Sequence, residues 1–168
     1  MKRLALALFA LLVAAPAGAA TVVTATVEEL ARSADLVVRG TVEARQARFH
    51  GARIYTTLRI RASAAWKGSA AEVVEVEIPG GVVGDVGQKV SGVAAFAEGE
   101  EVVLFLRRGG GAAYGVMGLS QGKFRVEGDT AKNEVGGLYR LEKPIPPGER
   151  VAEEMPLAEL ERRVRSAR

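Results

Sequence analysis

The stretch from Ile54 to Ala64 alternates between two sets of side chains with a period of two residues. Successive side chains of a β-strand point to opposite faces, so this alternation predicts a long strand with one face in the core and the other in solvent. It is the clearest periodic signal in the chain and makes a β-sheet the expected framework of the fold. The inward set is Ile54, Thr56, Leu58, Ile60 and Ala62, and the outward set is Tyr55, Thr57, Arg59 and Arg61.

Further strand-like segments follow at intervals of about ten residues, which is typical of a small barrel or sandwich. Residues 101–106 are apolar on both faces, as in a strand that is covered on both sides. Gly40 interrupts the first strand and predicts a bulge or bend, the alternative being a glycine tolerated in an edge strand. The expected strands are residues 36–43, 54–64, 74–78, 101–106, 114–119 and 122–126, with shorter ones at 89–93 and 138–141. A glycine-rich loop is expected at 80–87.

Two helices are expected, one before and one after the strands. Thr26 and Glu29 have the spacing of a capping box and predict a short helix over residues 27–33. A proline-rich break at 144–148 precedes a second helix that begins at Pro156, with an apolar stripe. The stripe consists of Leu157, Leu160 and Val164.

The first nineteen residues have the composition of a secretory signal peptide. Lys2 and Arg3 precede an apolar run from Leu4 to Val13, and Ala17-Gly18-Ala19 provides a cleavage site. The expected organisation is therefore a signal peptide at 1–19, a β-domain at 20–141, and a linker with the C-terminal helix at 142–168. The chain has no cysteine, so neither disulfides nor a thiol-linked lipid anchor can form. Its abundance of Ala, Gly, Val and Arg is typical of GC-rich bacteria. Together with the signal peptide, this predicts that the protein works in the periplasm, outer envelope or medium.

Three segments resemble netrin-like domains, a family that includes the tissue inhibitors of metalloproteinases. Residues 32–42 are similar to the family's Ser-Asp-Val-Val-Arg first strand, and residues 55–68 to its second strand, which closes on Lys-Gly. Residues 99–105 are similar to its Gly-Glu-aliphatic strand. The chain also looks like exported bacterial proteins with this strand pattern. The resemblance implies a mainly β fold, a small OB-type antiparallel barrel with a short N-terminal helix and a C-terminal helix.

The resemblance does not carry the family's inhibitory mechanism to this chain. In the metalloproteinase inhibitors, the mature N-terminal cysteine sits on the target's zinc through its amino and carbonyl groups. The family's cysteines are all absent here, and nothing at Ala20 or Thr21 matches that residue. The motifs that match are those of the fold.

Composition argues against most catalytic and cofactor chemistry. His50 is the single histidine, and no Gly-x-Ser-x-Gly motif is present, so a serine hydrolase has few candidate groups. Zinc sites of Cys or several His are excluded by count. Residues 80–87 lack the Gly-Lys-Ser/Thr ending of a phosphate-binding loop. We therefore expect no cofactor and no metal. Cleavage of the signal would reduce the formal net charge from +3 to +1, which makes nucleic acid an unlikely partner.

These observations favour a non-enzymatic exported module that binds a protein partner through two loops at the rim of the barrel, residues 49–53 and 80–87. One alternative is an inhibitor or companion of an extracellular metalloprotease. A second is a polyanion or glycan binder that uses Arg59, Arg61, Lys123 and Arg125, and a third is a structural envelope component. For residues 118–125, one interpretation is a face that stacks on or clamps an extended ligand, and the other is a hairpin turn at Gln121-Gly122 with Phe124 in the core. The candidate partner-binding residues are Phe49, His50, Arg53, Gly81, Val82, Val83, Asp85, Gln121, Lys123 and Arg125.

Overall fold

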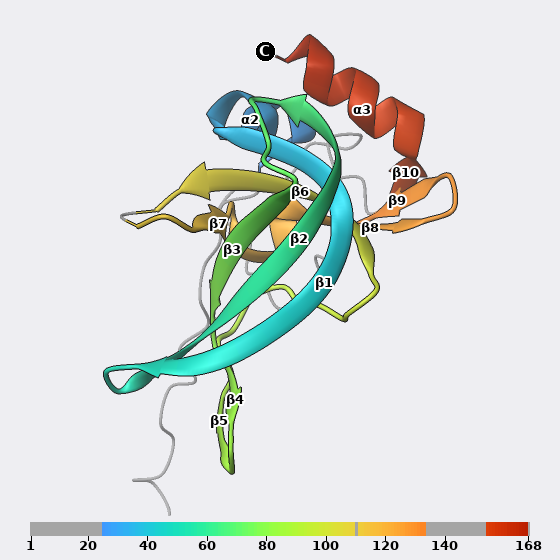
Figure 1. Cartoon of the computed structure of the whole chain (residues 1–168). Coiled ribbons are helices and arrows are strands. Elements are labelled where there is room, and N and C mark those ends of the chain that lie inside the picture. Colours follow the sequence, from blue (N-terminus) through green and yellow to red (C-terminus); the bar gives the residue numbers. More distant parts are fainter. Residues whose placement is uncertain (1–24, 110, 134–153, 168) are drawn as a thin grey trace, which may run out of the picture.

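A computed structural model describes residues 25–109, 111–133 and 154–167 (Figure 1). The fold is mainly β, as predicted, with one large mixed sheet, one small two-stranded sheet and a short helix from each end of the chain. The helices are α2 (Val27–Ser33), η2 (Leu119–Gly122, a 3-10 turn) and α3 (Leu157–Ser166). The strands are β1 (Leu36–His50), β2 (Arg53–Lys67), β3 (Val73–Pro79), β4 (Gly81–Val83), β5 (Val86–Gln88), β6 (Glu101–Arg108), β7 (Tyr114–Val116), β8 (Lys123–Glu127), β9 (Thr130–Lys132) and β10 (Glu154–Pro156).

Five strands of the large sheet form a partial ring. The strand order is β1-β2-β3-β7-β6-β8-β9-β10, and β1 pairs with β6 as well as with β2. The expected all-antiparallel arrangement is wrong at one place, because β3 and β7 run parallel, with Val76 opposite Tyr114. Parallel neighbours require a crossover connection. The chain between them supplies it by running through the β4–β5 hairpin and β6.

The first strand bends so that it joins both sides of the ring, as Figure 1 shows. Its first part pairs with β6 from Leu36 to Thr41 while its whole length pairs with β2. The register with β2 shifts between Arg39 and Gly40, which confirms the predicted irregularity. A Cβ at Gly40 would lie 2.4 Å from the backbone oxygen of Arg61. Gly40 is therefore a point of close backbone approach between two neighbouring strands, and the edge-strand interpretation is wrong.

Two apolar clusters fill the interior. The cluster inside the ring contains the predicted inward face of β2, where Leu58 and Ile60 are fully buried, together with alternate residues of β6. The other cluster lies between the sheet and the two helices and includes Trp66 and Phe105. Because β6 contributes to both, all its residues from Val102 to Leu106 are buried, as its apolar sequence predicted.

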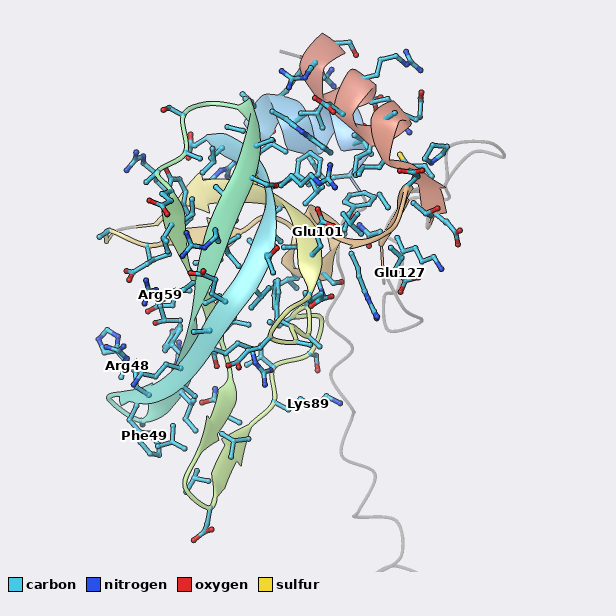
Figure 2. All side chains as sticks on the ribbon, turned by 45° about the vertical axis from the view of Figure 1, so that its right-hand side comes forward. Arg48, Phe49, Arg59, Lys89, Glu101 and Glu127 are labelled. Carbon is cyan, nitrogen blue, oxygen red and sulfur yellow. The ribbon has the colours of Figure 1, made fainter. Side chains whose placement is uncertain are left out.

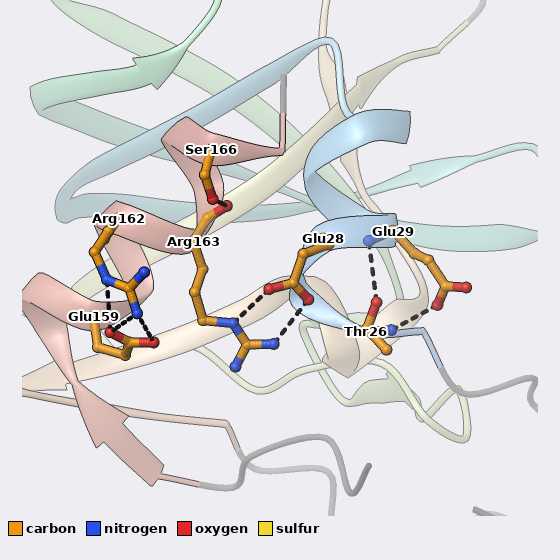
Figure 3. Close-up of polar contacts among 7 residues, drawn as sticks. All are labelled: Thr26, Glu28, Glu29, Glu159, Arg162, Arg163 and Ser166. Atoms are coloured by element: carbon orange, nitrogen blue, oxygen red, sulfur yellow. Dashed lines mark hydrogen bonds and ion pairs between the residues drawn. The ribbon is translucent and has the colours of Figure 1, made fainter.

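The N-terminal helix begins and ends as the sequence predicted. Thr26 and Glu29 form the capping box, in which each side chain accepts from the other residue's backbone N–H (Figure 3). At the other end, the Nζ of Lys67 donates to the carbonyls of Ala31 (2.7 Å) and Arg32 (2.9 Å). Cations favour this end of a helix. Lys67 belongs to the Lys-Gly pair at the end of the segment that resembles the second netrin-like strand, and its hydrogen bonds stabilise the docking of α2.

The C-terminal helix packs on the body of the protein. Leu157, Leu160 and Val164 are buried in the cluster that also holds α2, as the predicted stripe requires. Arg163 donates to both carboxylate oxygens of Glu28, at 2.6 and 2.8 Å (Figure 3). This hydrogen-bonded contact lowers the pKa of Glu28 below its ordinary value.

Several local predictions fail. No strand forms at 89–93, and residues 80–87 are a hairpin rather than a loop. The segment 89–96 instead lies over the end of the ring, where Phe96 and Ala94 are buried. The pairing of β9 with β10 was not predicted, because each has only three residues and therefore too little alternation. The predicted signal peptide, proline-rich break and strand at 138–141 lie outside the described residues. Within the described ranges, no helix is long and apolar enough to cross a membrane.

Candidate binding surface on two adjoining hairpins

The β1–β2 hairpin projects beyond the ring and ends in a tight turn. His50 pairs with Arg53 across Gly51 and Ala52, and Gly51 has a φ of 61° that suits such a turn. Inside the hairpin, Ile54 is buried, whereas Phe49 on the facing strand is 51% exposed. The first predicted rim segment is therefore the end of a long two-stranded arm.

The β4–β5 hairpin is tied to this arm close to its turn. The backbone N–H of Gly80 donates to the carbonyl of Ile54, and the backbone N–H of Ile54 donates to the Oε1 of Gln88, both at 2.7 Å. The hydroxyl of Thr56 donates to the carbonyl of Gly80, also at 2.7 Å. A Cβ at Gly81 would lie 2.4 Å from the Thr56 hydroxyl, so only glycine lets β4 approach this closely. The structure thus brings the two predicted rim segments together.

We call residues 47–54 and 81–88 the hairpin end of the molecule. All the large apolar side chains that are exposed in the described residues belong to it: Phe49, Val82 (69%) and Val86 (52%). By strand alternation, Val83 and Val86 lie on the face of β4–β5 that Gly81 turns toward β1, whereas Val82 lies on the opposite face. Exposed apolar groups gathered in one place mark interaction sites more often than the same groups scattered singly.

The exposed charges of the hairpin end are mostly positive. Arg48 is exposed on the β1–β2 arm and Lys89 follows β5 (Figure 2). Arg53 is also exposed on the arm, whereas Asp85 occupies the β4–β5 turn. The His50 ring lies 6.0 Å from that of Tyr55 in a tilted arrangement. This surface combines apolar side chains with cations, and its exposed histidine lies beside an aromatic ring.

The third predicted segment lies elsewhere and is largely internal. Gln121 is 1% exposed, and its Oε1 accepts from the backbone N–H of Ala25 at 2.8 Å. Lys123 is 5% exposed; its Nζ lies 2.6 Å from Glu100 and 4.6 Å from the centre of the Phe96 ring. Gln121 sits in the 3-10 turn η2, so the alternative hairpin turn does not form there, although Phe124 is in the core as that alternative required.

The four cations considered for a polyanion site are dispersed and mostly paired. Arg61 forms ion pairs with Glu43 and Glu72, and its hydrogen bond to Glu43 is the main cause of its raised pKa. Arg125 lies 3.2 Å from Glu127. Lys123 is buried, so of the four cations Arg59 remains, and it stands opposite Glu75. Arg61 stands opposite Val73, not opposite a glutamate.

Among the described residues, two cavities of about 330 and 260 Å³ open on the surface. The larger lies away from the hairpin end and is lined by Glu75, Arg108 and Tyr114, whereas the smaller adjoins the hairpin end and is lined in part by Gly81, Gln88 and Phe96. Both are at or below the lower end of the range for small-molecule sites, which is about 300–1,000 Å³. Among the described residues, no group of three or more His, Asp or Glu side chains is placed to hold a metal ion.

One signal in the sequence could have identified the second hairpin. Val83-Gly84-Asp85-Val86 places a Gly-Asp pair between two valines, which is a two-residue hairpin pattern, and Gly84 has a φ of 58°. Compared with known protein families and with curated protein sequences, the chain matches none. The function must therefore be argued from the surface itself.

Proposed function

We propose that this chain is an exported, non-enzymatic binding module that recognises a protein partner through the hairpin end. The observation that carries the proposal is that Phe49, Val82 and Val86 all belong to two adjoining hairpins, with Val82 and Val86 on opposite faces of β4–β5. Elsewhere in the described chain, large apolar side chains are buried or partly buried. Apolar groups with a polar and charged rim are the usual composition of a protein-binding surface.

For the fold, we propose an OB-type barrel of the netrin-like kind. An OB barrel is a five-stranded, partly open Greek-key barrel. The partial ring of β1, β2, β3, β7 and β6 supports this proposal, as does the bend of β1 at Gly40. Loops of such barrels commonly carry the binding function on a rigid scaffold.

The charges favour a protein over a polyanion as the partner. A polyanion site needs several free cations on one surface. Here Arg61 and Arg125 have carboxylate partners and Lys123 is buried with Glu100. The hairpin end, in contrast, offers apolar area. An envelope or secreted protein is the proposed partner, and an exported protease is one candidate, as the signal-like N-terminus and the family resemblance suggest.

The test compares three forms of the protein as bait for periplasmic and secreted fractions. The first is wild type, the second is Phe49→Ser/Val82→Ser/Val86→Ser, and the third is the control Ala71→Ser/Ala112→Ser, which changes exposed small residues around the larger cavity. We expect wild type and control to retain the same protein and the triple variant to lose it. Retention by all three forms, or by none, contradicts the proposal.

A further inference from the structure

The outer part of β1 has an open edge. Beyond Thr41, β1 no longer pairs with β6 and continues to His50 with β2 as its partner on one side. On the other side, no strand of the described residues pairs with the segment from Ala44 to His50. An open edge presents unpaired backbone N–H and C=O groups that can pair with another extended chain.

The register identifies which backbone groups point outward. The N–H of Arg45 donates to the Glu98 carboxylate at 3.2 Å, on the side away from β2. Alternate residues of a strand direct their backbone groups to the same side, so those of Ala47 and Phe49 also point outward. Their neighbours across the arm agree, because Ile54, opposite Phe49, directs its N–H and C=O away from β1 to Gln88 and Gly80. No described residue pairs with the outward backbone groups of Ala47 or Phe49.

The side chains along this edge alternate in chemistry. Ala47 and Phe49 lie on the face of β1 turned toward β4, since a Cβ at Gly81 would lie 2.9 Å from that of Ala47. Arg48 and His50 lie on the other face, with Arg53 beside them on β2. An added strand places its side chains on the same two faces. It therefore meets apolar groups on one face and cations on the other.

We infer that the edge of β1 from Ala44 to His50 accepts an extended segment of the partner whose side chains alternate between apolar and acidic. This inference rests on the proposed function and specifies how the partner binds. Main-chain hydrogen bonds to Ala47 and Phe49 hold the segment. An acidic residue faces Arg48, and an apolar residue packs beside Phe49 and the β4–β5 hairpin.

Charge also selects against a second copy of the chain as the occupant. Two copies paired antiparallel about Arg48, with Ala47 opposite Phe49, would place the two Arg48 side chains directly opposite each other, and pairing about Ala47 would leave them as diagonal neighbours. Like charges placed opposite each other destabilise strand pairing. A chain with acidic residues instead makes favourable cross-strand pairs, each worth about 0.2–1 kcal/mol.

The first experiment uses two synthetic peptides with the full chain, acetyl-(Val-Glu)3-amide and acetyl-(Val-Lys)3-amide. Amide NMR shifts and hydrogen exchange report the site. We expect the acidic peptide to shift the amides of Ala47 and Phe49 and to slow their exchange, and the basic peptide to bind at least about tenfold more weakly because of Arg48. Equal binding of the two peptides, or shifts confined to other parts of the chain, overturns the inference.

The second experiment removes the outward N–H with Ala47→Pro. Proline fits an edge strand where its nitrogen faces solvent, and Ala47→Ser is the matched control that keeps the N–H. We expect the proline variant to lose the acidic peptide and the serine variant to keep it. If the proline variant does not fold, the amide shifts and hydrogen exchange of the wild type with the two peptides decide whether the segment binds at this edge. Concentration-dependent dimerisation of wild type that Ala47→Pro abolishes overturns the inference in favour of a second copy.

The two proposals fail in different ways. A natural partner that is lost on replacing Phe49, Val82 and Val86, yet retained by Ala47→Pro, supports the proposed function and overturns strand addition. A partner that none of these changes affects contradicts both.

Discussion

Replacing Gly40 by alanine tests the bend of β1 directly. The added Cβ would lie 2.4 Å from the carbonyl oxygen of Arg61 and 2.9 Å from the Cγ2 of Ile60. Carbon and oxygen atoms normally stay about 3.3 Å apart even in close strand contacts. The two strands must therefore separate by roughly 0.9 Å at the position where Gly40 pairs with Ala62 on one side and Val102 on the other.

Three contributions determine how much Gly40→Ala changes the free energy of unfolding. Overpacking of this kind costs about 1–3 kcal/mol, and a weakened ladder hydrogen bond adds about 1 kcal/mol. The lower backbone entropy of alanine in the unfolded chain offsets about 0.4–1 kcal/mol. We expect Gly40→Ala to lower the free energy of unfolding by about 2–3 kcal/mol, a large part of the 5–15 kcal/mol typical of a domain.

Urea unfolding followed by tryptophan fluorescence is the assay. Trp66 is the only tryptophan of the chain, and it is 1% exposed in the cluster beneath the helices, so its emission reports loss of the core. With a slope of about 2 kcal/mol per molar urea, the midpoint should fall by about 1–1.5 M. The control is Gly115→Ala in β7, which is also paired on both sides but where a Cβ meets nothing within 4 Å. Equal midpoints for the two variants would refute the close-approach argument.

Three further predictions concern ion pairs and the exposed patch. Glu28→Gln should lower stability at pH 7 by about 0.5 kcal/mol. Because Arg163 lowers the pKa of Glu28 below 4.5 in the folded chain, this contribution is present above that pH and is lost as pH falls through the lowered pKa, so the two unfolding curves should converge in acid. Lys123→Met should cost about 3 kcal/mol, because among the described residues the buried Glu100 carboxylate then keeps only Arg125, 4.0 Å away, as a cation, and adding Glu100→Gln should cost less than the sum of the single changes in a double-mutant cycle. Phe49→Ser should leave the free energy of unfolding within about 0.5 kcal/mol of the wild-type value, since this side chain is half exposed. A larger loss of stability in the unfolding curve would mean that Phe49 packs in the core.

Local patterns in the sequence were enough to predict the elements whose signals lie within a few residues. The capping box at Thr26 and Glu29, the alternating faces of β2 and the stripe of α3 all appear where their spacing places them. Gly40 was predicted to mark a bulge or bend in the first strand, and the register of β1 with β2 shifts there. In each case the determining interactions are between near neighbours, or between one side chain and a generic apolar interior.

Tertiary structure decided which elements meet. Strand alternation shows which face of a segment is apolar, but it does not show which strand lies beside it, so the parallel pairing of β3 with β7 and the junction of the two hairpins had no local signal. Lys123 illustrates the same point. A lysine after a turn looks like an exposed cation in the sequence, yet it is buried because Glu100 and the carbonyl of Ala95 come from a distant segment to bind it. A charge can be buried only where the folded chain places partners around it. Long-range packing determines which residues become those partners.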